Sequence, residues 1–224
     1  MGGWSDYIIY AQDLSGLRDP KGLYSGRLGG MLSLGVIADT HVPDRRRSLD
    51  PRLLELLRSR DIQAILHAGD VSAPQVLREL ERIAPVYAVR GNRDWLWLRH
   101  LPSERIMTFG GVTIAMAHGH FGWLRYLLDR PYYTLHGYRH ERILPRLLRG
   151  FRQAQVIVFG HGHLPLNEWI DGRLLFNPGS PHFPSEKKVA PSLGFLHIQG
   201  GSEIRDENNI RDEQTVHGEI VTLD

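Results

Sequence analysis

Cysteine is absent from the 224-residue chain. Its absence excludes disulfide bonds, zinc fingers, iron–sulfur clusters and thiol nucleophiles. The chain also lacks any apolar run near the ~18 residues that a membrane-spanning helix needs. Its first residues show neither the basic flank nor the apolar run of a signal peptide. We therefore expect a cytoplasmic protein with no membrane partner.

Lysine is scarce, since only Lys21, Lys187 and Lys188 contribute to the 27 basic residues, and arginine supplies the rest. The formal net charge of +2 is too small to indicate nucleic-acid binding by itself. Apolar residues make up 42% of the chain and charged residues 23%, which is typical of a globular protein. The length suits one domain with a sizeable core.

Residues 1–30 differ from the rest because they hold seven glycines and little apolar periodicity. We interpret them as an N-terminal extension, either docked on the domain or flexible, and residues 31–224 as a single domain. Within that domain, a helix is expected from Pro51, with Asp50 as its N-cap, and another over 72–83. Short apolar runs predict strands over 32–38, 64–66, 86–89, 112–116, 156–159, 174–176, 194–198 and 219–223.

The alternation of strands and helices predicts an α/β fold, and the almost wholly apolar early strands suit a sheet buried on both faces. Five strands end in polar clusters, which are Asp39-Thr40-His41, Gly69-Asp70, Gly91-Asn92-Arg93-Asp94, His118-Gly119-His120 and Gly160-His161-Gly162-His163. Ligand sites in open α/β sheets lie beyond the carboxyl ends of the strands. Each cluster alone is explained as a turn or a solvated loop, but five at successive strand ends are not.

Convergence of these side chains would require a cation. Two carboxylates about 4 Å apart repel by roughly 4 kcal/mol at an effective dielectric of 20. Carboxylate, imidazole and amide ligands suit divalent transition metals, with manganese ranked first and nickel, zinc, iron or cobalt as alternatives. Seven candidate ligands fit two ions that share a bridging carboxylate: Asp39, His41, Asp70, Asn92, His118, His161 and His163.

These motifs resemble the calcineurin-like metallophosphoesterase superfamily, in particular its small single-domain prokaryotic phosphodiesterases, from Met31 to about Leu223. The resemblance implies a four-layer fold, a β-sandwich flanked by helices. It places one metal on Asp39, His41 and His163, the other on Asn92, His118 and His161, and Asp70 between them. It also implies that the turn Asn177-Pro178-Gly179-Ser180 packs near the site. The implied reaction is hydrolysis of a phosphodiester by a hydroxide that bridges the metals.

One position departs from the family pattern. Many relatives have histidine directly after the motif asparagine, where it protonates the leaving group, but this chain has Arg93. Arginine stays charged, so Arg93 is expected to neutralise phosphate charge. His120 is the nearest candidate proton donor, and a histidine behind the ligands or on the surface is the alternative. Arg45 is a candidate phosphate contact, with a solvated loop as the alternative reading.

The expected substrate is a small phosphate ester. The segment 121–151 mixes arginines with aromatic residues. We rank a lid or a homo-oligomer interface first, and a binding site for a nucleotide or a single-stranded nucleic acid second. A phosphomonoesterase or a nucleotide pyrophosphatase would use the same metal ligands. A non-catalytic scaffold of the same fold is the remaining alternative, and the presence of all seven ligand residues argues against it.

Overall fold

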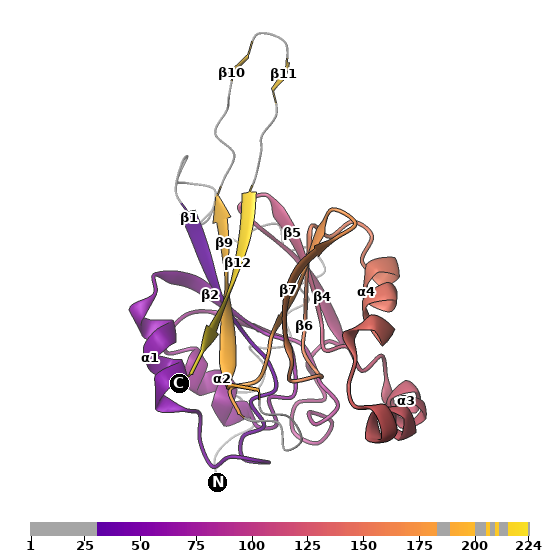
Figure 1. Cartoon of the computed structure of the whole chain (residues 1–224). Coiled ribbons are helices and arrows are strands. Elements are labelled where there is room, and N and C mark those ends of the chain that lie inside the picture. The colour runs from indigo at the N-terminus through magenta and orange to yellow at the C-terminus, as the bar shows by residue number, and fades with distance from the viewer. Residues whose placement is uncertain (1–30, 183–188, 200–204, 207–208, 211–214, 224) are drawn as a thin grey trace.

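The structure is a computed structural model that describes residues 31–182, 189–199, 205–206, 209–210 and 215–223. For residues 123–126, 205–206 and 209–210 it describes the backbone alone. The predicted extension, residues 1–30, lies outside the described residues. Two five-stranded sheets form the body of the molecule (Figure 1), with the orders β12-β9-β1-β2-β3 and β4-β5-β6-β8-β7.

The first sheet consists of β1 (Met31–Ile37), β2 (Ile62–His67), β3 (Val86–Ala88), β9 (Ser192–Gln199) and β12 (Thr215–Thr222). The second consists of β4 (Glu104–Phe109), β5 (Val112–Ala117), β6 (Val156–Phe159), β7 (Pro165–Ile170) and β8 (Arg173–Pro178). The helices are α1 (Pro51–Ser59), α2 (Pro74–Leu80), α3 (Trp123–His136), the 3₁₀ turn η2 (His140–Arg142) and α4 (Leu144–Gly150). The short strands β10 (Arg205–Asp206) and β11 (Asn209–Ile210) pair with each other.

Alternate side chains of the central strands enter different apolar layers, so three buried clusters separate four layers. Val36 of β1 and Val158 of β6 lie between the two sheets. Ile37 of β1 packs with residues of α1 and α2, whereas Ile157 of β6 packs with residues of α4. Figure 1 shows the helices on the two outer faces of the paired sheets. The predicted β-sandwich flanked by helices is confirmed.

Parallel pairing brings the predicted site residues to one end of this sandwich. Strands β1, β2 and β3 are parallel, and so are β5, β6 and β8. All five polar clusters follow the carboxyl ends of these strands, at the lower end of the sheets in Figure 1. The sheet topology therefore collects loops that are far apart in the sequence.

The first predicted helix is confirmed, because α1 begins at Pro51 and the Asp50 carboxylate accepts a hydrogen bond from the Arg52 N–H. The second prediction, a helix over 72–83, was too long, since α2 covers only Pro74–Leu80. Ser72 cannot belong to a helix because its φ is +75° and its N–H is bound by the Asp94 carboxylate. This residue belongs to the site loops instead.

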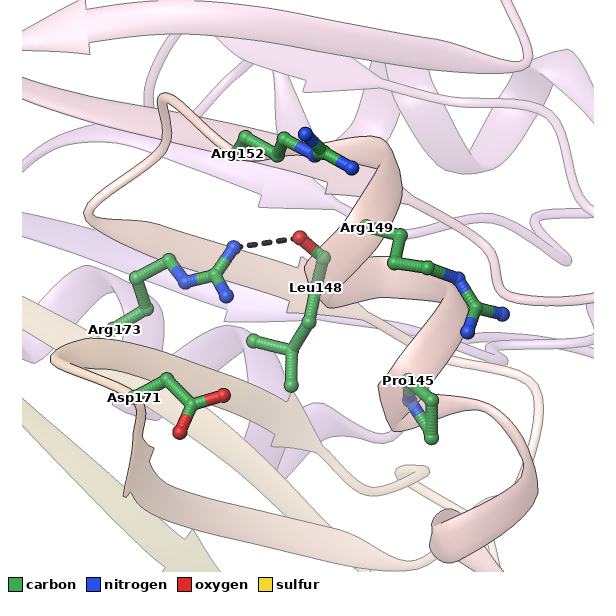
Figure 2. A pocket seen from close by; sticks show the side chains of 6 residues that line it. All are labelled: Pro145, Leu148, Arg149, Arg152, Asp171 and Arg173. Atoms are coloured by element: carbon green, nitrogen blue, oxygen red, sulfur yellow. Dashed lines mark hydrogen bonds between the residues drawn. The ribbon is translucent and has the colours of Figure 1, made fainter.

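The arginine-rich segment after β5 forms α3, η2 and α4. Arg142 and Arg146 each donate a hydrogen bond to the buried Asp129 of α3, at 3.1 Å. Arg173 donates to the Leu148 carbonyl at 2.7 Å, where it satisfies a free backbone acceptor at the end of α4 (Figure 2). Arg142 and Arg146 thus connect η2 and α4 to α3, and Arg173 connects α4 to β8. In the described part of the chain, none of the helices is both long enough and apolar enough to span a membrane.

Candidate metal centre

The loops that carry the candidate ligands have an unusual backbone. Asp39, His41, Asp70, His161 and His163 all have φ between +49° and +73°, in the left-handed region. Residues with a Cβ avoid this region, at a cost of order 1–3 kcal/mol each. Strain of this kind persists where surrounding structure fixes it, and it concentrates at functional sites. Five of the seven candidate ligands carry it, which marks these loops as a site.

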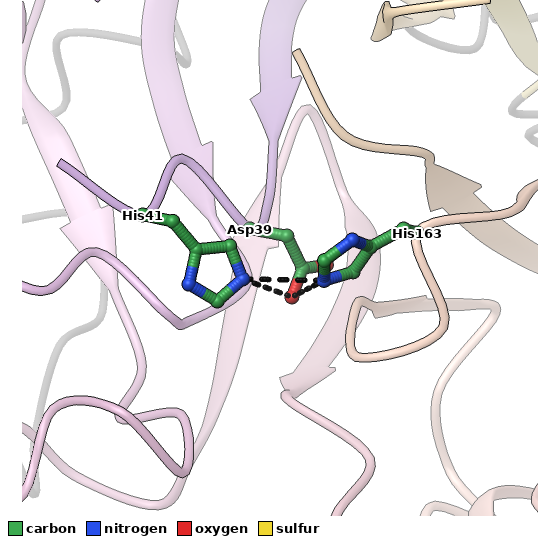
Figure 3. Close-up of side chains that lie close together, drawn as sticks. All are labelled: Asp39, His41 and His163. Carbon is green, nitrogen blue, oxygen red and sulfur yellow. Dashed lines mark hydrogen bonds and ion pairs between the residues drawn. The ribbon is translucent and has the colours of Figure 1, made fainter. Parts of the chain in front are cut away.

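The first group of ligand atoms consists of Asp39, His41 and His163 (Figure 3), whose atoms lie within 4.8 Å of one another. Asp39 Oδ1 is 3.4 Å from His163 Nε2 and 3.8 Å from His41 Nε2. The two Nε2 atoms are 3.2 Å apart. Three potential ligand atoms therefore converge on one small volume.

The second group consists of Asp39, Asp70 and His118. His118 Nε2 lies 3.5 Å from Asp70 Oδ1 and 3.1 Å from Asn92 Oδ1. Asn92 Oδ1 is in turn 3.0 Å from His161 Nδ1. All seven sequence-predicted ligands are thus brought together, and Asp39 contributes to both groups.

Asp70 belongs to the second group and also lies close to the first. Its Oδ1 faces His118 of the second group, and its Oδ2 is 3.6 Å from His41 Nε2 of the first. The Arg93 N–H donates to Oδ1 at 2.7 Å, which fixes the orientation of the carboxylate. Asp70 thus presents one oxygen to a histidine of each group.

Residues behind the ligands hold the loops in place. Asp39 Oδ2 accepts the His161 N–H at 2.9 Å, which ties the first cluster to the last. Ser180 donates its hydroxyl to the Asp39 carbonyl at 2.9 Å, and Asn177 donates its amide to the Gly160 carbonyl at 3.0 Å. The turn that contains Asn177 and Ser180 therefore packs against the site, as the resemblance implied.

Asp94 has a structural role that the sequence analysis did not assign. Its buried carboxylate accepts the Ser72 N–H at 2.8 Å and the Gly91 N–H at 2.7 Å, and so it joins the loops after β2 and β3. In the sequence, its place two residues after Asn92 indicates a site loop, but no local pattern indicates that it binds Ser72, 22 residues earlier. His67 is also buried, with its Nε2 3.1 Å from the Thr40 hydroxyl.

The donor chemistry fits a bound cation. Asp39 is fully buried, and its Oδ1 has no hydrogen-bond partner among the described residues. An unsatisfied buried carboxylate oxygen is costly. His118 Nδ1 lies 2.8 Å from the Ala68 carbonyl, to which it donates, so its Nε2 lone pair points at the oxygens of Asp70 and Asn92. A divalent ion satisfies lone pairs that would otherwise face one another.

Without a metal, a proton on His118 supplies positive charge among the ligand atoms. Burial alone would lower the pKa of His118, but the Asp70 carboxylate, with a smaller contribution from Asp39, raises that pKa to about 10. Burial would likewise raise the pKa of Asp70, yet the charge of His118 lowers it. Burial lowers the pKa of His161 to about 3 and that of His67 to about 3. His118 is thus the cation of the metal-free site.

These shifts predict the pH dependence of stability in chelator-treated protein. His118 has a folded pKa above the unfolded value, so its contribution is complete below pH 6.5 and is lost as the pH rises towards 10. His161 and His67 have depressed pKa values, so their contributions are lost as the pH falls from 6.5 towards 3. Urea midpoints should therefore peak near pH 6.5.

His118→Gln provides the test of the alkaline limb, with the exposed His136→Gln as the matched control. The decline above pH 6.5 should disappear in the first variant and remain in the second. An alkaline limb that is the same in all three proteins would contradict the assignment of the proton to His118.

The remaining sequence-predicted residues lie at the rim. The Arg93 guanidinium is about half exposed and lies 3.8 Å from Asp44. Arg45 is exposed, and its N–H donates to the His41 carbonyl at 2.7 Å. The His120 ring centroid is 5.4 Å from that of His118 and 6.3 Å from that of His161. All three are therefore adjacent to the ligand groups, although none belongs to them.

Comparison with known proteins agrees with this geometry. Residues 32–201 match the model of the calcineurin-like phosphoesterase superfamily domain. A probable metallophosphoesterase from Methanothermobacter thermautotrophicus is 33% identical over 75% of this chain and 86% of its own length. A phosphodiesterase from Methanocaldococcus jannaschii is 25% identical over 66% of this chain and 83% of its own length.

The fold agrees as well. Vacuolar protein sorting 29 from Cryptosporidium parvum has a similar structure, with a TM-score of 0.61, 20% sequence identity, and coverage of 86% of this chain and 98% of that one. The family match spans most of the described residues, and the family and the ligand groups together indicate a divalent metal site. The chain belongs to the calcineurin-like phosphoesterase superfamily.

Proposed function

We propose that this protein is a phosphodiesterase that works with two divalent metal ions. The observation that carries the proposal is the position of Asp70, whose two oxygens face His118 and His41 of different ligand groups. One ion would be held by Asp39, His41 and His163, the other by Asn92, His118 and His161. Manganese is the first choice, with nickel, zinc, iron or cobalt as alternatives.

When bound, such ions lower the pKa of a shared water and offset the charge that develops on phosphorus oxygens. The protein's own groups fix the geometry that this chemistry needs. Asp39 and Asp70 are each held by a backbone N–H, from His161 and Arg93 respectively. The ligand loops therefore need little rearrangement when the ions enter.

Arg93 and Arg45 are proposed to contact the phosphate of the substrate. Both guanidinium groups are at the rim, within a few residues of a ligand, and both keep their charge at any working pH. Their role would be to bind and orient a phosphate anion. A small phosphate ester is the proposed substrate. A homo-oligomer and a cytoplasmic location stay predictions from the sequence.

His120 is proposed to protonate the leaving group. Burial, followed by the charge of His118, lowers its pKa to about 4, and its Nδ1 is buried without a partner among the described residues. In the metal-free protein the ring is therefore neutral near pH 7, and the proposed role requires the ring to gain a proton when the metals and a phosphate are bound. Substrates with good leaving groups do not need that proton.

His120→Gln should consequently show a strong dependence on the leaving group. We expect kcat for a 4-nitrophenyl diester to change little, whereas kcat for a diester with an alkyl leaving group should fall by about 10²-fold. The exposed His100→Gln is the matched control and should change neither. Equal losses with both leaving groups would remove His120 from the proton-donor role.

The proposed function is tested with metal-stripped protein to which manganese, nickel, zinc, cobalt or buffer is added back. Bis(4-nitrophenyl) phosphate should be hydrolysed only with metal, and at least about tenfold more efficiently in kcat/KM than 4-nitrophenyl phosphate. Preference for the monoester or for a nucleotide pyrophosphate would show that the substrate is not a phosphodiester, whereas the proposed metal site would stand. Metal binding without any turnover would favour a non-catalytic scaffold.

A further inference from the structure

A pocket with a volume of about 420 Å³ lies at the loop between β1 and α1, next to the loop of the metal centre that carries His41. The residues of its lining that matter here are Arg45, Arg46, Arg47, Ser48, Asp50 and His182. It is larger than a single phosphate group requires and opens along the loop between β1 and α1. Its three consecutive arginines indicate that it binds an anion.

Both walls of this pocket are attached to the first ligand cluster. The Arg45 and Arg46 N–H groups donate to the His41 carbonyl, at 2.7 and 3.4 Å. On the other side, the Ser180 hydroxyl donates to the Asp39 carbonyl and accepts the His182 N–H at 3.2 Å. Both walls of the pocket are therefore anchored to the loop that carries Asp39 and His41.

The pocket carries a positive charge. Arg46 and Arg47 are exposed, and neither has a carboxylate partner among the described residues. The one acid in the lining, Asp50, is bound by the Arg52 guanidinium through two hydrogen bonds, at 3.1 and 2.8 Å. The carboxylate is thus neutralised from outside, and the arginines remain available to a ligand.

His182 supplies a buried polar group in the same lining. Its exposed fraction is 6%, and its Nε2 is buried without a hydrogen-bond partner among the described residues. Its ring also hydrogen-bonds to the Thr40 backbone, which occupies the other nitrogen. A neutral ring then offers a lone pair at Nε2, which accepts a hydrogen bond from a protonated oxygen.

Arginines together with one hydrogen-bond acceptor match a phosphate monoester. Such a group is partly protonated near neutral pH, since its second pKa is about 6. Its charged oxygens accept from guanidinium groups, and its P–OH can donate to Nε2. A phosphodiester has no such proton. The arginines also bind the dianion of a monoester more strongly than the single charge of a diester, so the lining favours a terminal phosphate over an internal one.

Another pocket lined by arginines offers a contrast (Figure 2). It is formed by Arg149, Arg152 and Arg173 with Asp171, near the end of α4. Arg173 is committed to the Leu148 carbonyl, and none of the unpartnered buried side-chain atoms belongs to this lining. The pocket beside the metal centre thus differs from this one in having a buried, unpartnered ring nitrogen, that of His182.

We propose that the pocket formed by Arg46, Arg47 and His182 binds a terminal phosphate of the substrate. The preferred substrates are then phosphodiesters that carry a second, monoester phosphate. This inference rests on the proposed phosphodiesterase function for its substrate, but the binding of a monoester phosphate is independent of turnover.

The kinetic test compares two diesters that differ only in the second phosphate, in the metal-loaded full chain. These are thymidine 3′-phosphate 5′-(4-nitrophenyl phosphate) and thymidine 5′-(4-nitrophenyl phosphate). The first should have a kcat/KM at least about tenfold higher. In the double variant Arg46→Gln/Arg47→Gln this ratio should fall towards one. Arg152→Gln, from the pocket near α4, is the control and should keep the full ratio.

A binding measurement separates this proposal from the proposed function. In chelator-treated protein, methyl phosphate should shift the ¹⁵N resonances of the His182 ring, and dimethyl phosphate at the same concentration should not. The double arginine variant should lose the shift. A kcat/KM ratio of one for the two diesters in the wild type overturns the substrate class, even if free methyl phosphate binds.

If neither diester is hydrolysed, the proposed function fails. If methyl phosphate also leaves the His182 resonances unchanged, the proposed phosphate pocket fails as well.

Discussion

Asp70→Asn is expected to reduce metal-dependent diester hydrolysis by at least about 10³-fold. Asparagine is nearly isosteric, so the Arg93 N–H keeps its acceptor and the fold should be retained. The amide has no negative charge, however, and it cannot present an anionic oxygen to each of the two ligand groups that now face the carboxylate. The measurement is kcat/KM with bis(4-nitrophenyl) phosphate at saturating manganese.

Asp61→Asn is the matched control, because Asp61 is exposed and the same charge is removed. A second readout shows that the variant is folded and altered at the site. Since the Asp70 carboxylate raises the pKa of His118 to about 10, that pKa should fall in metal-free Asp70→Asn. Near wild-type activity in Asp70→Asn would contradict the bridging role.

Gly91→Ala is expected to reduce both stability and activity, although it adds a single methyl group. A Cβ at this position would overlap the backbone nitrogen and Oδ1 of Asp70. These atoms cannot move independently, because Gly91 itself is held by Asp94 at 2.7 Å. Overpacking of this kind costs about 1–3 kcal/mol. A displaced Asp70 should also reduce kcat/KM by about 10²-fold.

Gly150→Ala is the control for the change in residue type. Apart from its chain neighbours and the backbone of its own helix, no atom lies within 4 Å of a Cβ at this position, at the end of α4. Alanine is the better helix former, so stability should be unchanged or higher by up to about 1 kcal/mol, with full activity. Normal metal affinity and activity in Gly91→Ala would show that the close approach to Asp70 does not matter.

The sequence was most informative where two patterns coincided. Short apolar strands predicted sheets buried on both faces, and polar clusters at their ends predicted where the loops meet. Asp39 and His41, two residues apart after β1, do face the same volume as His163. Because parallel strands end at the same edge, such an assembly can be deduced without knowing the order of strands in each sheet.

What the sequence could not supply depends on contacts between distant loops. The role of Asp94 is set by the Ser72 N–H, which no local pattern connects to it. Ser72 itself was assigned to a helix, because its polar side chain beside Pro74 is also typical of a helix start. The edge strands β4 and β7 were not predicted, since most of their side chains are exposed or half-buried and neither strand has a continuous apolar run.

His182 illustrates the same point for the pocket beside the metal centre. In the sequence it is a single histidine two residues after a motif serine, and it carries no recognisable signal. Only the fold places it against Thr40 and opposite the arginines of the loop after β1. The residues of this pocket are thus harder to recognise in the sequence than the metal ligands are.

The number of manganese ions bound per chain tests the central claim most directly. Equilibrium dialysis of metal-stripped protein, followed by electron paramagnetic resonance, counts the ions and reports whether they are coupled. We expect two ions per chain with the spectrum of a coupled pair, and fewer than two in Asp70→Asn. One uncoupled ion per chain, or none, would contradict the two-metal centre.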